Sequence, residues 1–211
     1  DEAIPLIERS LAIEEATRGP THPELIYGLN NLAEVLIAAG RPAEAAPYLA
    51  RGQAIIDERD LKATSQGVLI LSSRAALARA LGHAAEALAL REEACAVAEG
   101  LYGGAHPVVG ECLGNLAGLR LDQGDLAGAA AALERGRAIL ADEREHHHNL
   151  LALQMIEASL RWAEPGRRAE ARALVDAVAA EVEKAAATEG DKPEFRALRR
   201  QIKAWRADHP A

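Results

Sequence analysis

The sequence repeats itself at an interval of 42 residues. The stretches that begin at Thr21 and Ala105 lie 84 residues apart and share a His-Pro pair, an Asn-Leu-Ala core and a closing glycine. Two sets of small residues recur at half of this distance, every 42 residues, and we call each set a repeat column. The glycine column is Gly40, Gly82, Gly124 and Gly166, and the alanine column is Ala3, Ala45, Ala87, Ala129 and Ala171. A unit of this size buries its apolar face only against a neighbouring unit, so the interval predicts a stacked array.

The composition predicts that the array is helical. Apolar residues make up 49% of the 211 residues and aromatic residues only 3%, and alanine, the strongest helix former, is abundant. The scarcity of β-branched and aromatic residues disfavours sheets. A net charge of −8 argues against a nucleic-acid partner, and no apolar run reaches the roughly 18 residues of a membrane span. We therefore expect an all-α protein that neither binds nucleic acid nor spans a membrane.

Each unit is predicted to contain two helices. Gly40 ends the first helix of the first unit, whose apolar stripe comprises Leu25, Leu29, Leu32, Val35 and Leu36. Pro42 begins the second helix, and Ala45 is expected where the two helices cross most closely. The predicted helices cover about 2–16, 24–39, 42–58, 65–81, 84–100, 107–122, 126–142, 147–163, 167–187 and 192–208.

Local signals at the starts of the first helices are interpreted as structural. Thr21 and Glu24 have the spacing of a capping box. His22 and His106 each precede a proline, and we expect them to fix the entry of the chain into the helix. A further column of the 42-residue repeat carries Ile7, Leu49, Leu133 and Val175, with Arg91 as its one charged member.

These spacings resemble a known repeat family. The order Leu29, Leu32, Ala33, Leu36, Gly40, Ala45, Leu49 resembles the tetratricopeptide-repeat (TPR) pattern. The 42-residue period, with "GPTHPE", "LNNLA" and "AGRPAEA", resembles the kinesin-light-chain subtype, which is common in bacterial multidomain proteins. The resemblance implies a right-handed α–α superhelix, a TPR solenoid of antiparallel helix pairs.

The repeat register divides the chain into an array and a terminal helix. Residues 1–189 form the TPR array, with a half repeat at 1–19 and units at about 20–61, 62–103, 104–145 and 146–189. Residues 190–211 are expected to form a C-terminal capping helix, whose apolar stripe is Phe195, Leu198, Ile202 and Trp205. Its basic face is interpreted as solvated, with a docking site as the alternative. Because the half repeat is a second-type helix without its mate, we expect the chain to begin inside a longer array.

The family resemblance also implies where a partner would bind. The first helices would line a concave groove, and its positions fall on Tyr27, Asn30, Asn31, Glu34, Ser72, Ser73, Arg79, Glu111, Asn115, Asp122, Leu153, Ile156 and Glu157. Asn31 and Asn115 are expected to hold the backbone of an extended peptide, because an amide both donates and accepts. Hydrogen bonds between neighbouring hairpins are the alternative role.

The expected function is a protein–protein interaction module that binds a partner segment in this groove and is not an enzyme. The acids Glu111, Asp122 and Glu157 favour a basic or apolar protein or peptide as partner. Two alternatives remain open. One is a sensory or regulatory TPR segment of a larger bacterial signalling enzyme, such as a kinase, signalling ATPase or protease. The other is a scaffold that self-associates into a homo-oligomer through the array ends.

No cofactor or metal is expected. The run His146-His147-His148 suggests a metal ligand set, but consecutive residues of a helix point about 100° apart, so a role at a helix start is preferred. Cys95 and Cys112 are interpreted as small buried residues with free thiols, a disulfide or catalysis being the alternatives. Two cysteines in 211 residues make no disulfide scaffold, and a cytoplasmic location is expected.

Overall fold

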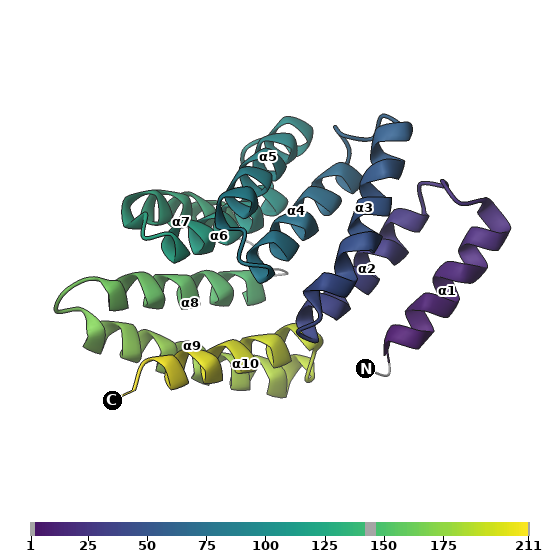
Figure 1. Cartoon of the computed structure of the whole chain (residues 1–211). Helices are drawn as coiled ribbons and strands as arrows, with labels where there is room; N and C mark the ends of the chain where they lie inside the picture. Colours follow the sequence, from purple (N-terminus) through teal and green to yellow (C-terminus); the bar gives the residue numbers. More distant parts are fainter. Residues whose placement is uncertain (1–2, 142–146, 211) are drawn as a thin grey trace. The chain divides into compact units, whose positions relative to one another are not determined.

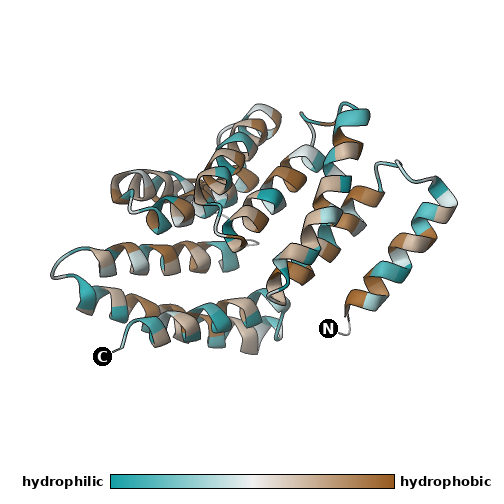
Figure 2. Cartoon of the chain, viewed as in Figure 1, coloured by the Kyte–Doolittle hydropathy of each residue, from teal (hydrophilic) through white to brown (hydrophobic). Residues whose placement is uncertain are grey.

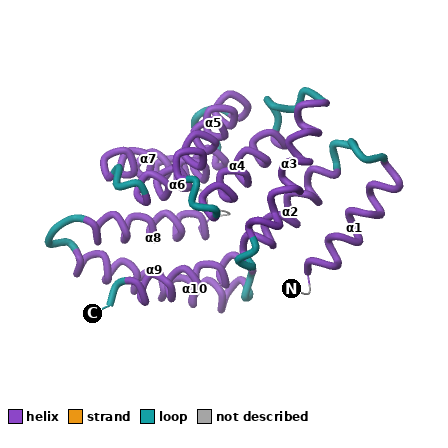
Figure 3. The backbone as a smooth tube through the Cα atoms, in the orientation of Figure 1, coloured by secondary structure: helices purple, strands orange, loops and turns teal. Residues whose placement is uncertain are grey.

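The structure is a computed structural model that describes residues 3–141 and 147–210. Within these residues every regular element is an α-helix and no strand occurs (Figures 1 and 3). The helices are α1 (Ala3–Arg18), α2 (Leu25–Ala38), α3 (Pro42–Glu58), α4 (Ser65–Ala80), α5 (Ala84–Tyr102), α6 (Pro107–Asp122), α7 (Leu126–Leu140), α8 (His147–Ala163), α9 (Arg168–Glu189) and α10 (Pro193–Asp208). The all-α prediction is confirmed, and every predicted helix end lies within about two residues of the observed one.

The glycine column ends the first helix of each pair. Gly40, Gly82, Gly124 and Gly166 have φ values of 74°, 81°, 78° and 84°. These values lie in the left-handed region, where a residue with a Cβ atom is strained and glycine is not. The chain then turns at once into the second helix, which in α3 begins at Pro42. The predicted left-handed glycine at the end of the first helix is confirmed.

Histidine side chains accept backbone hydrogen bonds at the entry into two of the first helices, and at α6 the histidine is the N-cap residue. His22 Nδ1 accepts a hydrogen bond from the backbone N–H of Glu24 at 3.2 Å, and His106 Nδ1 accepts one from Val108 at 3.2 Å. The structural interpretation of the two histidines is therefore confirmed. The capping box is wrong, because the Thr21 hydroxyl instead accepts a hydrogen bond from Arg59 at 2.9 Å. An imidazole nitrogen is an acceptor in the right tautomer, so His22 holds the turn that leads into α2, although α2 itself has no side-chain cap.

The chain forms two compact units, Asp1–Gly104 and Ala105–Ala211. In the first unit α2 pairs with α3 and α4 with α5, while α1 packs on α2. Its main core consists of aliphatic side chains, among them Leu25, Ile26, Leu29, Leu32, Ile55 and Ile70. In the second unit α6 pairs with α7, α8 pairs with α9, and α10 packs on both α9 and α8. Among the described residues, no helix is long and apolar enough to cross a membrane.

The alanines of the column that follow Ala3 are buried in the second helices of the pairs. Ala45, Ala87 and Ala171 are fully buried, and Ala129 is 1% exposed. A methyl group is all that the contact accommodates, because buried helices pack at nearly crystalline density. The predicted burial of these alanines is confirmed.

Replacing Ala87 with leucine should therefore overpack the α4–α5 contact and lower the free energy of unfolding by about 1–3 kcal/mol. Thermal unfolding followed by circular dichroism measures the loss. Ala89, which is exposed on the same helix, provides the matched control, because Ala89→Leu adds the same side chain to the solvent face. Equal melting temperatures for the two variants would contradict the assigned helix contact.

Arg91 is a buried cation at a position where the other units carry an aliphatic residue. It is 7% exposed, whereas Leu49 and Leu133 at the equivalent positions are 1% and 4% exposed. Its guanidinium donates a hydrogen bond to the backbone carbonyl of Ser72 at 3.0 Å. Burial, together with the nearby charge of Arg79, lowers the pKa of Arg91 to about 10. Keeping Arg91 charged thus costs the folded state free energy at neutral pH.

Arg91→Leu should raise the free energy of unfolding at pH 7 by about 1–3 kcal/mol, because an aliphatic residue replaces a desolvated charge. The pKa is lower in the folded state, so the unfolded chain binds more protons above pH 10. The advantage of leucine should consequently shrink as the pH rises through about 10. Urea unfolding measures the change, and the reciprocal Leu133→Arg should destabilise the chain. A less stable Arg91→Leu variant would contradict the prediction.

Candidate functional site

The first unit exposes a strip of side chains along α2. Tyr27, Asn31 and Glu34 are exposed and lie three or four residues apart, so they share one face of the helix. The opposite face carries Leu25, Leu29, Leu32 and Leu36 into the core. Tyr27 is 43% exposed, which makes it one of the most exposed large hydrophobic residues described. We call Tyr27, Asn31 and Glu34 the α2 strip.

Helix α4 lies beside the α2 strip and contributes less to it than the sequence predicted. The Ser73 hydroxyl donates a hydrogen bond to Glu34 at 3.1 Å, which joins the two first-type helices. Ser72 is half-buried and Arg79 is exposed. The structure thus brings Glu34 together with Ser73, while Arg79 lies at the other end of α4.

Two predicted groove residues of the first unit are buried. Asn30 is 1% exposed and Ser73 is 3% exposed, so neither offers a surface to a partner, and their predicted exposure is wrong. The amide oxygen of Asn30 finds no hydrogen-bond partner among the described residues. Asn30 and Asn31 are neighbours about 100° apart around the helix, and only Asn31 faces outward.

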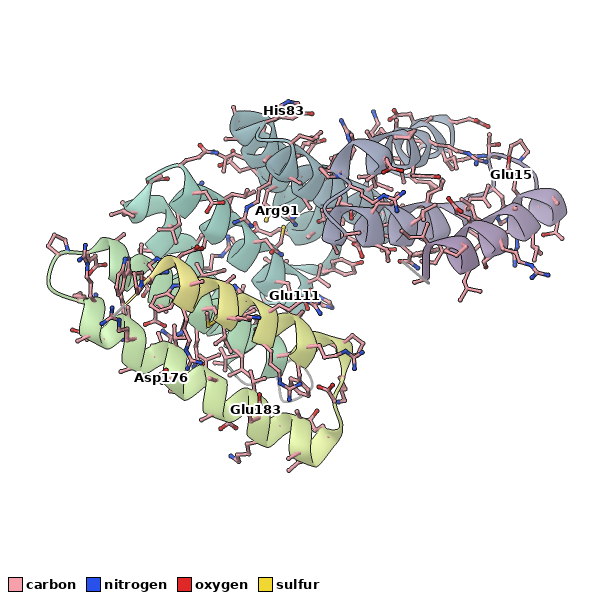
Figure 4. The ribbon with its side chains drawn as sticks, turned by 60° about the horizontal axis from the view of Figure 1, so that its bottom comes forward. Glu15, His83, Arg91, Glu111, Asp176 and Glu183 are labelled. Carbon is pink, nitrogen blue, oxygen red and sulfur yellow. The ribbon has the colours of Figure 1, made fainter. Side chains whose placement is uncertain are left out.

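The second unit exposes an equivalent strip along α6. Asn115 and Asp122 are exposed, and Glu111 is half-buried one turn before Asn115. We call these three residues the α6 strip. The Asn115 amide donates a hydrogen bond to the backbone carbonyl of Glu111 at 3.1 Å, and Glu111 accepts one from the side chain of Asn149 on α8 (Figure 4). Asn115 therefore already uses a donor within its own helix.

Helix α8 offers less to a partner than its predicted groove residues Leu153, Ile156 and Glu157 indicated. Leu153 is 3% exposed and fills the space above Gly114, and Ile156 is half-buried. The side chain of Glu157 is only 14% exposed and forms ion pairs with Arg161 and, at 2.7 Å, with Arg137. Leu153 was predicted to line the groove and Glu157 to favour a basic partner. The structure instead buries Leu153 and pairs Glu157 with two arginines.

The structure contains a hollow that the sequence did not predict. It has a volume of about 590 Å³ and lies between α7 and α8 in the second unit. Aliphatic atoms of Leu133 and Leu160 line it together with Arg137, Glu157 and Arg161. Its arginines and carboxylates pair with one another, so it lacks an excess of one charge. Pairing between helices depends on their relative rotation, which a repeat register does not specify.

The basic face of α10 is largely compensated by acids. Arg199 binds both carboxylate oxygens of Glu183 on α9, at 2.7 and 2.8 Å, and also pairs with Asp191. Arg199 thereby lowers the pKa of Glu183 and of Asp191. Arg206 pairs with Asp176 at 2.6 Å; Figure 4 shows both α9 acids. This arrangement supports the solvated interpretation of the face over a docking site.

The histidine run and the cysteines give little support to catalysis or metal binding. His146 lies outside the described residues, as does the side chain of His147. Among the described residues, no group of three His, Cys, Asp or Glu side chains is placed to hold a metal ion. Cys95 and Cys112 are buried as expected, at 5% and 4% exposure. The expectation of free thiols is wrong, because both cysteines are disulfide-bonded, the alternative that the sequence left open.

Comparison with known proteins identifies relatives of this architecture. A family model described as tetratricopeptide repeat matches residues 1–58 and 68–142. Two crystal structures from Podosopora anserina, of nearly identical TPR-like repeats assigned to a kinesin light chain, are similar to the chain. One has a TM-score of 0.65 and 27% identity over 90% of this chain and 88% of that one. The other has a TM-score of 0.63 and 28% identity over 85% of each. No curated protein matches the sequence.

Proposed function

The chain belongs to the tetratricopeptide-repeat family, whose repeats are protein–protein interaction modules, and we propose that it holds a partner segment on its first helices without catalysing a reaction. The α2 strip and the α6 strip are the surfaces that we assign to this role. Each strip lies on the solvent face of a helix whose other faces are fixed by the core. A fixed helix positions its exposed side chains at little entropic cost to binding.

The observation that carries the proposal is the exposure of Asn31 and Asn115 at equivalent repeat positions. They lie 84 residues apart, and both remain exposed while the residues that precede and follow them on the inner face are buried. An exposed asparagine can accept from a peptide N–H and donate to a peptide C=O. Such contacts recognise any extended segment, whatever its side chains.

The partner segment is proposed to be mainly apolar. The exposed ring of Tyr27 offers an apolar contact, and aromatic side chains dominate the energy of many protein interfaces. Glu34, Glu111 and Glu157 each accept a hydrogen bond from a neighbouring side chain, which reduces their attraction for basic residues. A preference for basic side chains should therefore be secondary and should weaken as salt is added.

A peptide array tests the proposal with wild-type protein and the variants Asn31→Ala, Asn115→Ala and Tyr27→Ala. Each asparagine variant should weaken all bound peptides by about five- to tenfold, the value of one net hydrogen bond. Tyr27→Ala should weaken apolar peptides more than polar ones. Gln201→Ala, which removes an exposed amide from α10, is the matched control and should bind as wild type.

Two results would contradict the proposal. One is an array in which acidic peptides dominate the wild-type binders at low and high salt. The other is an unchanged set of peptides, with unchanged affinities, in all three variants. Either result would place the interaction surface away from the α2 and α6 strips. Turnover of a substrate by the purified protein, unaffected by the three substitutions, would contradict the non-catalytic part of the proposal.

A further inference from the structure

Helix α1 has two faces that consist of small or apolar residues, and the described residues cover only one of these faces. Ile4 and Leu11 are buried in the core against α2. The second face consists of Ala3, Leu6, Ser10 and Ile13, which we call the α1 outer face. All four are exposed, and Leu6 and Ile13 are 69% and 56% exposed. Figure 2 shows brown, hydrophobic stretches that recur along α1. Exposed aliphatic residues that share one face of a helix mark a surface that binds another molecule or segment.

The repeat register shows which element covers the equivalent face of the four later second helices, α3, α5, α7 and α9. The equivalents of Ala3, shifted by multiples of 42 residues, are the buried alanines 45, 87, 129 and 171. The equivalents of Ser10 are buried as well: Gly52, Ala94, Gly136 and Val178. The equivalent of Ile13 in α3 is Ile55, which is 2% exposed. In these helices the covering element is the first helix of the same pair, as the α2–α3, α4–α5, α6–α7 and α8–α9 contacts show.

We propose that the α1 outer face binds an amphipathic α-helix from outside these 211 residues, of the type that forms the first helix of each repeat. Such a helix carries large aliphatic residues and one small residue in the pattern of Leu29, Leu32, Ala33 and Leu36. The small residue permits the close approach that Ala3 and Ser10 allow. This surface is distinct from the α2 and α6 strips, so the inference goes beyond the proposed function.

The helices of a second copy fit this face poorly. The four first-type helices of a copy, α2, α4, α6 and α8, already pair with their own second helices. Helix α10 presents Arg200, Gln201 and Lys203 on its exposed side, and these polar side chains do not match Leu6 and Ile13. The chemistry of the face therefore favours a separate first-type helix.

An N-terminal extension that copies residues 20–42 in front of Asp1 tests the proposal, because it places a first-type helix in the natural repeat register. In the unextended chain, amides of 3–18 should exchange with solvent faster than those of 107–122. With the extension, exchange in 3–18 should slow by about tenfold or more, because the covered helix opens less often. The control is the same extension in which serine replaces the three leucines copied from Leu29, Leu32 and Leu36.

A second variant tests whether the α1 outer face itself binds the added helix. Leu6→Lys with Ile13→Lys should leave the unextended chain folded, because both side chains are mostly exposed, and should abolish the protection gained from the extension. Equal exchange with the leucine and the serine extension would overturn the proposal. Light scattering that shows self-association of the unextended chain, lost in the double lysine variant, would overturn it too, because a second copy would then be the occupant.

Discussion

Trp205→Ala is expected to lower the free energy of unfolding of the second unit by about 3–5 kcal/mol. Trp205 is 7% exposed in the core that α10 forms with α8 and α9. Its indole N–H donates to the Ser159 hydroxyl at 3.0 Å, and its ring packs edge-on against Trp162 with centroids 5.5 Å apart. Truncation would leave a large cavity and a hydroxyl without its donor. Both losses fall on the packing of α10 against α8 and α9.

Urea unfolding followed by the fluorescence of Trp162 measures this effect, because Trp162 is then the one remaining tryptophan. Lys203→Ala, an exposed truncation on the same helix, is the control and should change stability by less than about 0.5 kcal/mol. A Trp205→Ala variant as stable as this control would show that α10 does not cover the core. That result would also remove the support for its role as a capping helix.

Gly67→Ala should destabilise the first unit by about 3 kcal/mol, an unusually large effect for one methyl group. A Cβ atom at Gly67 would lie 2.2 Å from the backbone oxygen of Lys62 and 2.8 Å from that of Leu61. The turn cannot shift away easily. The Thr64 hydroxyl donates to Leu61 at 2.6 Å and accepts from the N–H of Gly67 at 3.3 Å.

Gly100 provides a control with the opposite expected sign. It lies in α5, and nothing lies within 4 Å of the position of an added Cβ atom. Gly100→Ala should therefore stabilise the chain by roughly 0.5–1 kcal/mol, because alanine loses less backbone entropy in a helix. Thermal unfolding by circular dichroism compares the two variants. Equal melting temperatures would contradict the tight turn between α3 and α4.

The features that local chemistry determines could be predicted from the sequence. The glycine column needs a left-handed residue, and the alanine column needs a small one, so both are visible in the letters and both are confirmed. The helix bounds follow from apolar spacing and from prolines such as Pro42 and Pro107. The sequence indicated Arg91 only as the one charged member of an aliphatic repeat column. The desolvation of its guanidinium depends on the neighbouring side chains, which only the structure shows.

The features that depend on helix rotation could not be predicted. A family pattern placed both Asn30 and Asn31 in a groove, but a helix turns about 100° per residue, so only one of two neighbours faces a given direction. Glu157 was counted as an acid open to a partner, and its neutralisation required Arg137 from another helix. The net charge that a surface offers to a partner therefore depends on side chains from neighbouring helices, and the residues of one helix face do not determine it.

Nuclear magnetic resonance can locate the binding of a partner segment on the first helices. A peptide selected on the array is added to isotopically labelled protein, and the shifts of assigned amide resonances are mapped. We expect the largest changes at Tyr27 and Asn31 on α2 and around Asn115 on α6, with little change along α3 and α7. Changes confined to α3, α7 or α10, with unchanged α2 and α6 resonances, would contradict the claim.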